Sequence, residues 1–279
     1  NFWRKTVPLL PPPATELAPL GQSIWTPTAP AKSSISRPWV HLLLFALTMF
    51  SMTAAGAMQQ GVDPLSSIQA LVHLVEGLPF AATLLFILTV HEFGHYFAAR
   101  HWGVKASLPY FLPLPYISFL GTLGAVIKIH SPIPHKRALL DIGAAGPLAG
   151  FVIALIACFA GLAHSSIVST DAFHVYPIEL GSPLLFSGIA ALVLPEIGPN
   201  QLVLLNPVAF AGWVGLFITA FNLFPIGQLD GGHIVYALFG SWHRHIARTA
   251  YAILLGMGVY GILSLIWELP QGWPGGLAL

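Results

Sequence analysis

The sequence predicts an all-α polytopic membrane protein with about five transmembrane helices and a short membrane-associated β element. Of its 279 residues, 56% are hydrophobic and only 8% are charged, whereas a soluble domain has about 25% charged residues. Several apolar runs are also long enough to cross the roughly 30 Å hydrocarbon core of a bilayer as helices. The expected partner is therefore the lipid bilayer, and a formal net charge of +1 argues against a nucleic-acid partner.

The apolar runs and the breaks between them give the expected spans. These are Trp39–Met58, Leu78–Arg100, Ala138–Ala163, Leu202–Phe224 and Ile246–Trp267. The apolar stretch Pro183–Pro195 is too short to cross and is expected to be interfacial or re-entrant. Pro-rich residues 1–38 are expected to form a cytosolic N-terminal segment. Residues 39–279 would form the membrane domain, with the catalytic core at about 78–236.

The positions of Lys and Arg predict the orientation of these spans. All 11 lie before the first span, between the second and third, or around the link between the fourth and fifth. The positive-inside rule therefore places the N-terminus and the basic loops in the cytoplasm and the C-terminus outside. A multi-pass protein of a bacterial plasma membrane is the first expectation, and an organelle membrane is the second.

The segment between the second and third spans is too rich in proline for a continuous helix. Its core, Phe119–Ile129, is expected to form a short strand or hairpin around Gly121 and Gly124. An unwound substrate segment could add to this edge as a strand, which would satisfy its backbone hydrogen-bonding groups. The alternative is a cytosolic loop at the membrane surface.

The second expected span contains the sequence HEFGH, which is typical of zinc hydrolases. Residues four apart share a face of a helix, so His91 and His95 can bind one metal ion. Glu92 lies about 100° further round the helix and can reach a water on that metal without being a ligand. Ionisable side chains inside a membrane helix are costly and therefore indicate function.

A catalytic zinc usually has three protein ligands, so one more is expected. Asp230, in the sequence QLDGG, is the preferred candidate because the predicted topology places it on the same side of the membrane as HEFGH. Asp141 is the competing carboxylate, although a favourable charge near a helix start explains it more simply. One Zn²⁺ per chain is expected at His91, His95 and Asp230. Glu92 would take a proton from a water that attacks a peptide carbonyl.

Three further features have both a chemical and a simpler explanation. Asn222 is expected to hydrogen-bond the substrate carbonyl or the oxyanion, and helix packing is its alternative role. His233 follows LDGG and is more simply a packing residue than a neighbour of the metal ligands. The glycines of GAAGPLAG are expected to permit close helix approach rather than to take part in chemistry.

Three motifs resemble the site-2 protease family of intramembrane zinc metalloproteases. They are HEFGH, GAAGPLAGF and NLFPIGQLDGGH, and the resemblance covers roughly Leu78–Tyr236. It implies cleavage of a single-span membrane protein within or near the bilayer, often after another protease has trimmed it. It also implies that Asp230 is the third ligand and that Asn222 matches the Asn of an NPxP-type motif. Leu223 departs from that motif, which often has proline there.

Two other function classes remain open. A membrane zinc peptidase of the prenyl-protein-processing type would add a Glu ligand from a later helix, and the late Glu268 is expected on the wrong side of the membrane. A non-proteolytic zinc-binding transporter or scaffold would not need the intact Glu92. The sequence therefore favours a zinc-dependent intramembrane endopeptidase.

Overall fold

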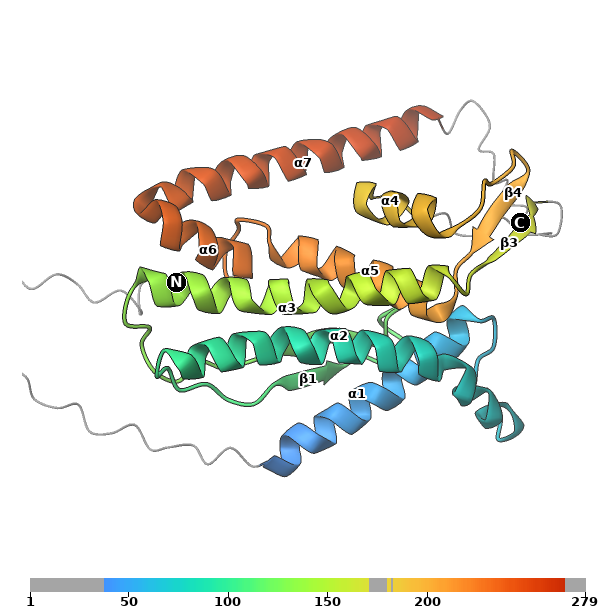
Figure 1. Ribbon diagram of the computed structural model, residues 1–279, viewed down its shortest axis with the longest axis horizontal. Helices are drawn as coiled ribbons and strands as arrows, with labels where there is room; N and C mark the ends of the chain where they lie inside the picture. The colour runs from blue at the N-terminus through green and yellow to red at the C-terminus, as the bar shows by residue number, and fades with distance from the viewer. Residues whose placement is uncertain (1–37, 171–179, 182, 269–279) are drawn as a thin grey trace, which may run out of the picture. The chain divides into compact units, whose positions relative to one another are not determined.

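The computed structural model describes residues 38–170, 180–181 and 183–268, except for the side chains of Leu265 and Glu268 (Figure 1). The helices and strands, in chain order, are α1 (Pro38–Gln59), η2 (Gln69–His73), α2 (Leu74–His101), β1 (Tyr110–Pro113), β2 (Thr122–Val126), α3 (Lys136–Leu162), β3 (Ser166–Ser169), α4 (Leu184–Val193), β4 (Gln201–Leu204), α5 (Pro207–Asn222), α6 (Asp230–Phe239), η4 (Gly240–Trp242) and α7 (His243–Glu268). The N-terminal segment expected at residues 1–38 lies outside the described residues, apart from Pro38.

The helices α2, α3 and α5 form the centre of the bundle. Helix α3 packs against both α2 and α5, and α1 packs against α2 (Figure 1). One apolar cluster, which includes Met52, Phe80 and Leu84, joins α1, α2 and α5. A second cluster, which includes Ala154 and Cys158, joins α3, α4 and α5. Every helix that carries an expected site residue therefore contacts this centre or begins beside it.

Glycines allow two of these helix pairs to approach closely. A Cβ atom at Gly77 of α2 would overlap the carbonyl oxygen of Thr53 on α1. A Cβ atom at Gly161 of α3 would overlap the backbone nitrogen of Ala209 on α5. Lipid tails are as apolar as the helix surfaces, so association in a membrane depends on such close packing.

Within the described residues, four helices are long and apolar enough to cross a membrane, so the expected count of five is not confirmed. Helices α1 and α3 agree with the first and third expected spans to within two residues, and α2 begins four residues before the second. The fourth candidate runs from Asp230 to Ser264 through α6, η4 and α7. It includes most of the fifth expected span, but α6 was not predicted as a helix.

The prediction of a fourth span at Leu202–Phe224 was wrong in its length. Residues Gln201–Leu204 form β4, which pairs with β3. Helix α5 begins only at Pro207, because the side chain of Asn206 accepts a hydrogen bond from the backbone N–H of Val208 and so caps the helix. The remaining 16 residues make a helix about 24 Å long, which is shorter than the bilayer core.

The β element after α2 is an antiparallel pair of strands. Strand β2 lies within the expected range Phe119–Ile129, but its partner β1 lies further upstream than predicted. Gly121 (φ 74°) and Gly124 (φ 102°) have backbone conformations that favour glycine. Figure 1 shows β1 between α1 and α2, and the pair contacts both helices. Its membrane association stays a prediction.

A second small group of elements follows the C-terminal end of α3. It consists of the antiparallel pair β3 and β4 and the ten-residue helix α4. The length of α4 agrees with the expectation that Pro183–Pro195 is too short to cross, and its interfacial position stays a prediction. A cavity of about 1170 Å³ lies between these elements and the start of α5.

The close approach of α3 and α5 gives a first test of the fold. We expect Gly161→Ala to lower the free energy of unfolding by about 1–3 kcal/mol, because the backbone of α5 must shift to accept the new methyl group. Unfolding in SDS, followed by circular dichroism, measures this change. Gly258→Ala is the matched control, since a Cβ atom at Gly258 meets no atom within 4 Å. Equal losses in both variants would contradict this account of the α3–α5 contact.

Candidate metal centre

His91 and His95 face the interior of the bundle from one side of α2, as their spacing predicts. Both side chains are buried, at 5% and 8% exposed. The two rings meet edge to face, and their Nε2 atoms lie 3.2 Å apart. The helix thus brings two imidazole nitrogens to one point.

Asp230, the first residue of α6, completes this cluster. Its Oδ2 lies 3.3 Å from Nε2 of His91, and its Oδ1 lies 3.3 Å from Nε2 of His95. The turn after α5 can fold back against α6 because Gly231 and Gly232 leave room for it. A Cβ atom at Gly231 would overlap the carbonyl oxygen of Leu223, and one at Gly232 would lie 2.6 Å from the carbonyl oxygen of Gly227.

The spacing of these atoms fits a zinc ion. Tetrahedral zinc has bonds of about 2.0–2.1 Å to nitrogen and oxygen, so its ligand atoms lie about 3.3 Å apart. The two histidine nitrogens lie 3.2 Å apart, and each lies 3.3 Å from an oxygen of Asp230. Three such ligands leave a fourth position open, as in catalytic rather than structural zinc sites.

The other acidic candidates are not in the cluster. Among the described residues, His91, His95 and Asp230 form the one group of potential ligands that lie close enough together to hold an ion. The carboxylate of Asp141 instead accepts a hydrogen bond from Nε1 of Trp102 at 3.1 Å. Glu268 ends α7, and its side chain lies outside the described part of the structure.

Glu92 is buried beside the cluster without belonging to it. The residue is 7% exposed. Its carboxylate interacts with His95 and Asp230 and with the backbone N–H of Ile127, the residue after β2. The β1–β2 pair therefore contacts the acid that lies nearest to the expected ligands.

Helix α3 holds both imidazoles, and this contact was not predicted from the sequence. Nδ1 of His95 donates a hydrogen bond to the carbonyl oxygen of Ile142 at 2.6 Å, which leaves Nε2 free to act as a ligand. A Cβ atom at Gly146 would overlap the ring of His95, and one at Gly150 would lie 3.0 Å from Cβ of His91. The glycines of GAAGPLAG do permit close packing, but what they approach is the pair of histidines.

The two remaining candidates lie at the edge of the centre. Asn222 ends α5 and is partly buried, and within the described ranges its side chain makes no hydrogen bond. His233 packs against α3, because a Cβ atom built at Gly143 of α3 would lie 3.5 Å from Cβ of His233. The structure therefore brings His91, Glu92, His95 and Asp230 together and leaves the role of Asn222 as a prediction.

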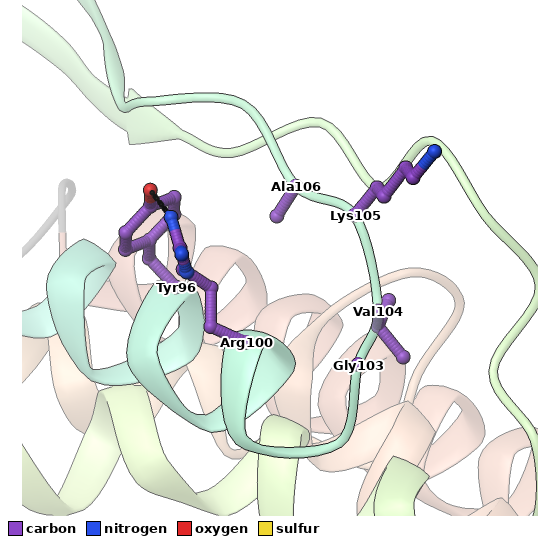
Figure 2. A pocket seen from close by; sticks show the side chains of 6 residues that line it. All are labelled: Tyr96, Arg100, Gly103, Val104, Lys105 and Ala106. Carbon is purple, nitrogen blue, oxygen red and sulfur yellow. Dashed lines mark hydrogen bonds between the residues drawn. The ribbon is translucent and has the colours of Figure 1, made fainter.

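The face of α2 that carries Glu92 continues to Tyr96 and Arg100, one and two turns further along. Figure 2 shows these two side chains beside the backbone of residues 103–106, where they line a hollow of about 360 Å³. Arg100 Nη1 donates a hydrogen bond to Tyr96 Oη at 3.1 Å. None of the residues of the metal centre lines this hollow, which agrees with the burial of that centre.

Comparison with known proteins shows which family and which relatives this chain is similar to. The model of peptidase family M50 matches residues 79–265. The "Probable zinc metalloprotease EGY1, chloroplastic" of Oryza sativa subsp. japonica is 35% identical over 266 residues, which cover 86% of this chain and 45% of that protein. The "Probable zinc metalloprotease EGY2, chloroplastic" of Arabidopsis thaliana is 33% identical over 213 residues, which cover 74% of this chain and 36% of that protein.

A third relative is the "Probable zinc metallopeptidase EGY3, chloroplastic" of Arabidopsis thaliana. It is 29% identical over 249 residues, which cover 84% of this chain and 43% of that protein. The chain thus spans less than half the length of these relatives. The match to the family model includes every residue of the cluster described above.

The packing of α3 against the imidazoles gives a test of the metal centre. We expect Gly146→Ala to weaken zinc binding by at least about 10–100-fold, because the methyl group displaces the ring of His95 from the cluster. Zinc per chain, measured by atomic emission after dialysis against a competing chelator, reports this loss. Gly256→Ala on α7 is the matched control, since its Cβ meets no atom within 4 Å. Wild-type zinc content in Gly146→Ala would contradict this assignment.

Proposed function

Because this chain belongs to peptidase family M50, which is the site-2 protease family that its motifs resemble, we propose that it is a zinc metalloendopeptidase acting within the membrane. The observation that carries the proposal is the cluster of His91, His95 and Asp230, in which the two Nε2 atoms lie 3.2 Å apart and each lies 3.3 Å from a different carboxylate oxygen of Asp230. Glu92 is buried beside this cluster. The names of the relatives, zinc metalloprotease and zinc metallopeptidase, support the same chemistry.

His91, His95 and Asp230 are the proposed zinc ligands, one ion per chain. The hydrogen bond from His95 to the carbonyl of Ile142 fixes the ring so that Nε2 points toward Asp230. Zinc, when bound, supplies a Lewis acid that polarises a carbonyl group and makes water more acidic.

Glu92 is the proposed general base. It follows a ligand on the same helix but lies outside the ligand cluster, so its carboxylate remains available to accept a proton from the attacking water. It can then return that proton to the leaving amine. The backbone N–H of Ile127 interacts with this carboxylate, and we expect that it helps to orient it.

The proposed substrates are single-span membrane proteins, some of them already shortened by another protease. A bilayer contains no water for exposed backbone groups, so an unwound substrate needs hydrogen-bonding partners. Strand β2 pairs with β1 on one side, and its side chains Leu123 and Val126 are 68% and 50% exposed. Addition of a substrate strand along β2 would satisfy its backbone close to Glu92.

We place the enzyme in an organelle membrane rather than a bacterial plasma membrane. The apolar helices support an integral membrane protein. The word chloroplastic in the names of the relatives favours the organelle, which was the second expectation from the sequence.

Cleavage of a tagged single-span protein by the purified chain in detergent tests the proposal. We expect Glu92→Gln to lower the rate by about 10²–10⁴-fold, because proton transfer is lost, while zinc remains at one per chain. Asp230→Ala should lose both zinc and activity. A Glu92→Gln variant that binds zinc and cleaves as fast as wild type would exclude this mechanism. Zinc binding without hydrolysis of any substrate would favour the transporter or scaffold.

Asn222 provides a separate test of how the oxyanion is stabilised. We expect Asn222→Leu to lower kcat by about 10²–10³-fold, because the amide that would hydrogen-bond the substrate is lost while the branched shape and the number of side-chain heavy atoms are kept. Zinc content should not change. If Asn222 only packs against its neighbours, Asn222→Leu will cleave at the wild-type rate.

A further inference from the structure

Helix α1 is hydrogen-bonded to both ends of the β1–β2 pair through its side chains. Nδ1 of His41 donates a hydrogen bond to the carbonyl oxygen of Pro109, just before β1, at 3.0 Å. Oγ of Ser51 donates to the carbonyl oxygen of Gly121, just before β2, at 2.6 Å. Near its end, α1 also donates from Gln59 to the loop between the strands. These bonds fix the position of the strand pair relative to α1.

Two of these bonds are buried, so each is costly to break. His41 and Ser51 are 7% and 3% exposed, and a buried carbonyl that loses its donor remains unsatisfied. The ring of His41 also packs on Tyr110, with the centroids 4.2 Å apart. Within the described residues, Nε2 of His41 has no hydrogen-bond partner. In the part of the chain that the structure describes, the imidazole of His41 therefore hydrogen-bonds through Nδ1 alone.

The strand pair connects these bonds to Glu92. Tyr110, which packs on His41, is the register partner of Val126 on β2. Strand β2 packs against α2, and the backbone N–H of the next residue, Ile127, interacts with the carboxylate of Glu92. A continuous series of packed and hydrogen-bonded groups thus runs from α1 to the proposed general base.

We propose that His41 and Ser51 are positioning residues of the active centre. They hold the β1–β2 pair against α1 and thereby keep the backbone N–H of Ile127 on Glu92. Helix α1 lies outside residues 79–265, the part that matches the family model. The inference rests on the proposed function, because it takes Glu92 to be the base, but the geometry that it describes can be measured without proteolysis.

Hydrogen exchange of the full zinc-loaded chain, together with steady-state cleavage, tests this proposal. His41→Phe keeps a ring against Tyr110 and removes the Nδ1 donor, whereas His41→Asn keeps an N–H near the same place. Ser51→Ala removes the second bond and serves as the alternative if His41→Phe does not fold. Leu42→Ala is the control, because Leu42 is the next residue of α1 and is 69% exposed.

We expect the amide of Ile127 to exchange roughly five- to tenfold faster in His41→Phe, with a similar loss of kcat, since one buried hydrogen bond is lost. Zinc should remain at one per chain. His41→Asn and Leu42→Ala should resemble wild type in both measurements. Glu92→Ala should also speed exchange at Ile127, because it removes the carboxylate that the N–H is proposed to contact.

Wild-type exchange at Ile127 in His41→Phe, or in Ser51→Ala if His41→Phe does not fold, would overturn the proposal. It would also be overturned if His41→Phe lowers only the melting temperature and leaves kcat unchanged. Failure of wild type to cleave any substrate would count against the proposed function alone. The exchange at Ile127 in His41→Phe and Glu92→Ala would still decide whether α1 holds the strand pair on Glu92.

Discussion

Burial of ionisable side chains inside an apolar bundle is the constraint on which the rest of this structure depends. His91, Glu92 and His95 lie within α2, where isolated charges would be expensive. Each therefore needs a polar partner from another element. Asp230 reaches both imidazoles from α6, Ile142 of α3 accepts the hydrogen bond of His95, and the segment after β2 provides an N–H for Glu92. The contacts of these elements with α2 provide the polar partners that the ionisable side chains of one short segment of that helix require.

Helix α3 has to meet two demands at the same time. It must approach α2 closely enough for its backbone to touch the imidazoles, and it must pack tightly against α5 on its other side. Small residues meet both demands, with Gly146 beside His95 and Gly161 beside Ala209. One glycine-rich helix therefore joins the metal centre to the core. Substitutions in it are expected to affect stability or metal binding according to which neighbour they meet.

The sequence predicted what depends on local geometry. The spacing of His91 and His95 places them on one face of any helix, and the predicted topology selected Asp230 over Asp141. The pairing of β1 with β2 could not be predicted in the same way, because strand partners depend on contacts distant in sequence. The contact of Ile127 with Glu92 depends on that pairing. The start of α5 was misplaced because apolar residues 202–205 fit a strand and a helix equally well. The cap at Asn206 and the following proline were the signals that distinguish the two.

The short length of α5 has a consequence for the lipid around the active centre. Hydrocarbon chains that meet a helix of 16 residues must compress or tilt to match it, at a cost of fractions of a kcal/mol per Å. Phe217 and Phe221 are exposed near the end of α5, close to the turn that leads to Asp230, and their side chains are expected to meet these chains. The membrane there is expected to be thinner than elsewhere. Hydrolysis consumes water, and local thinning shortens the distance that water must travel to reach a reaction buried among apolar helices.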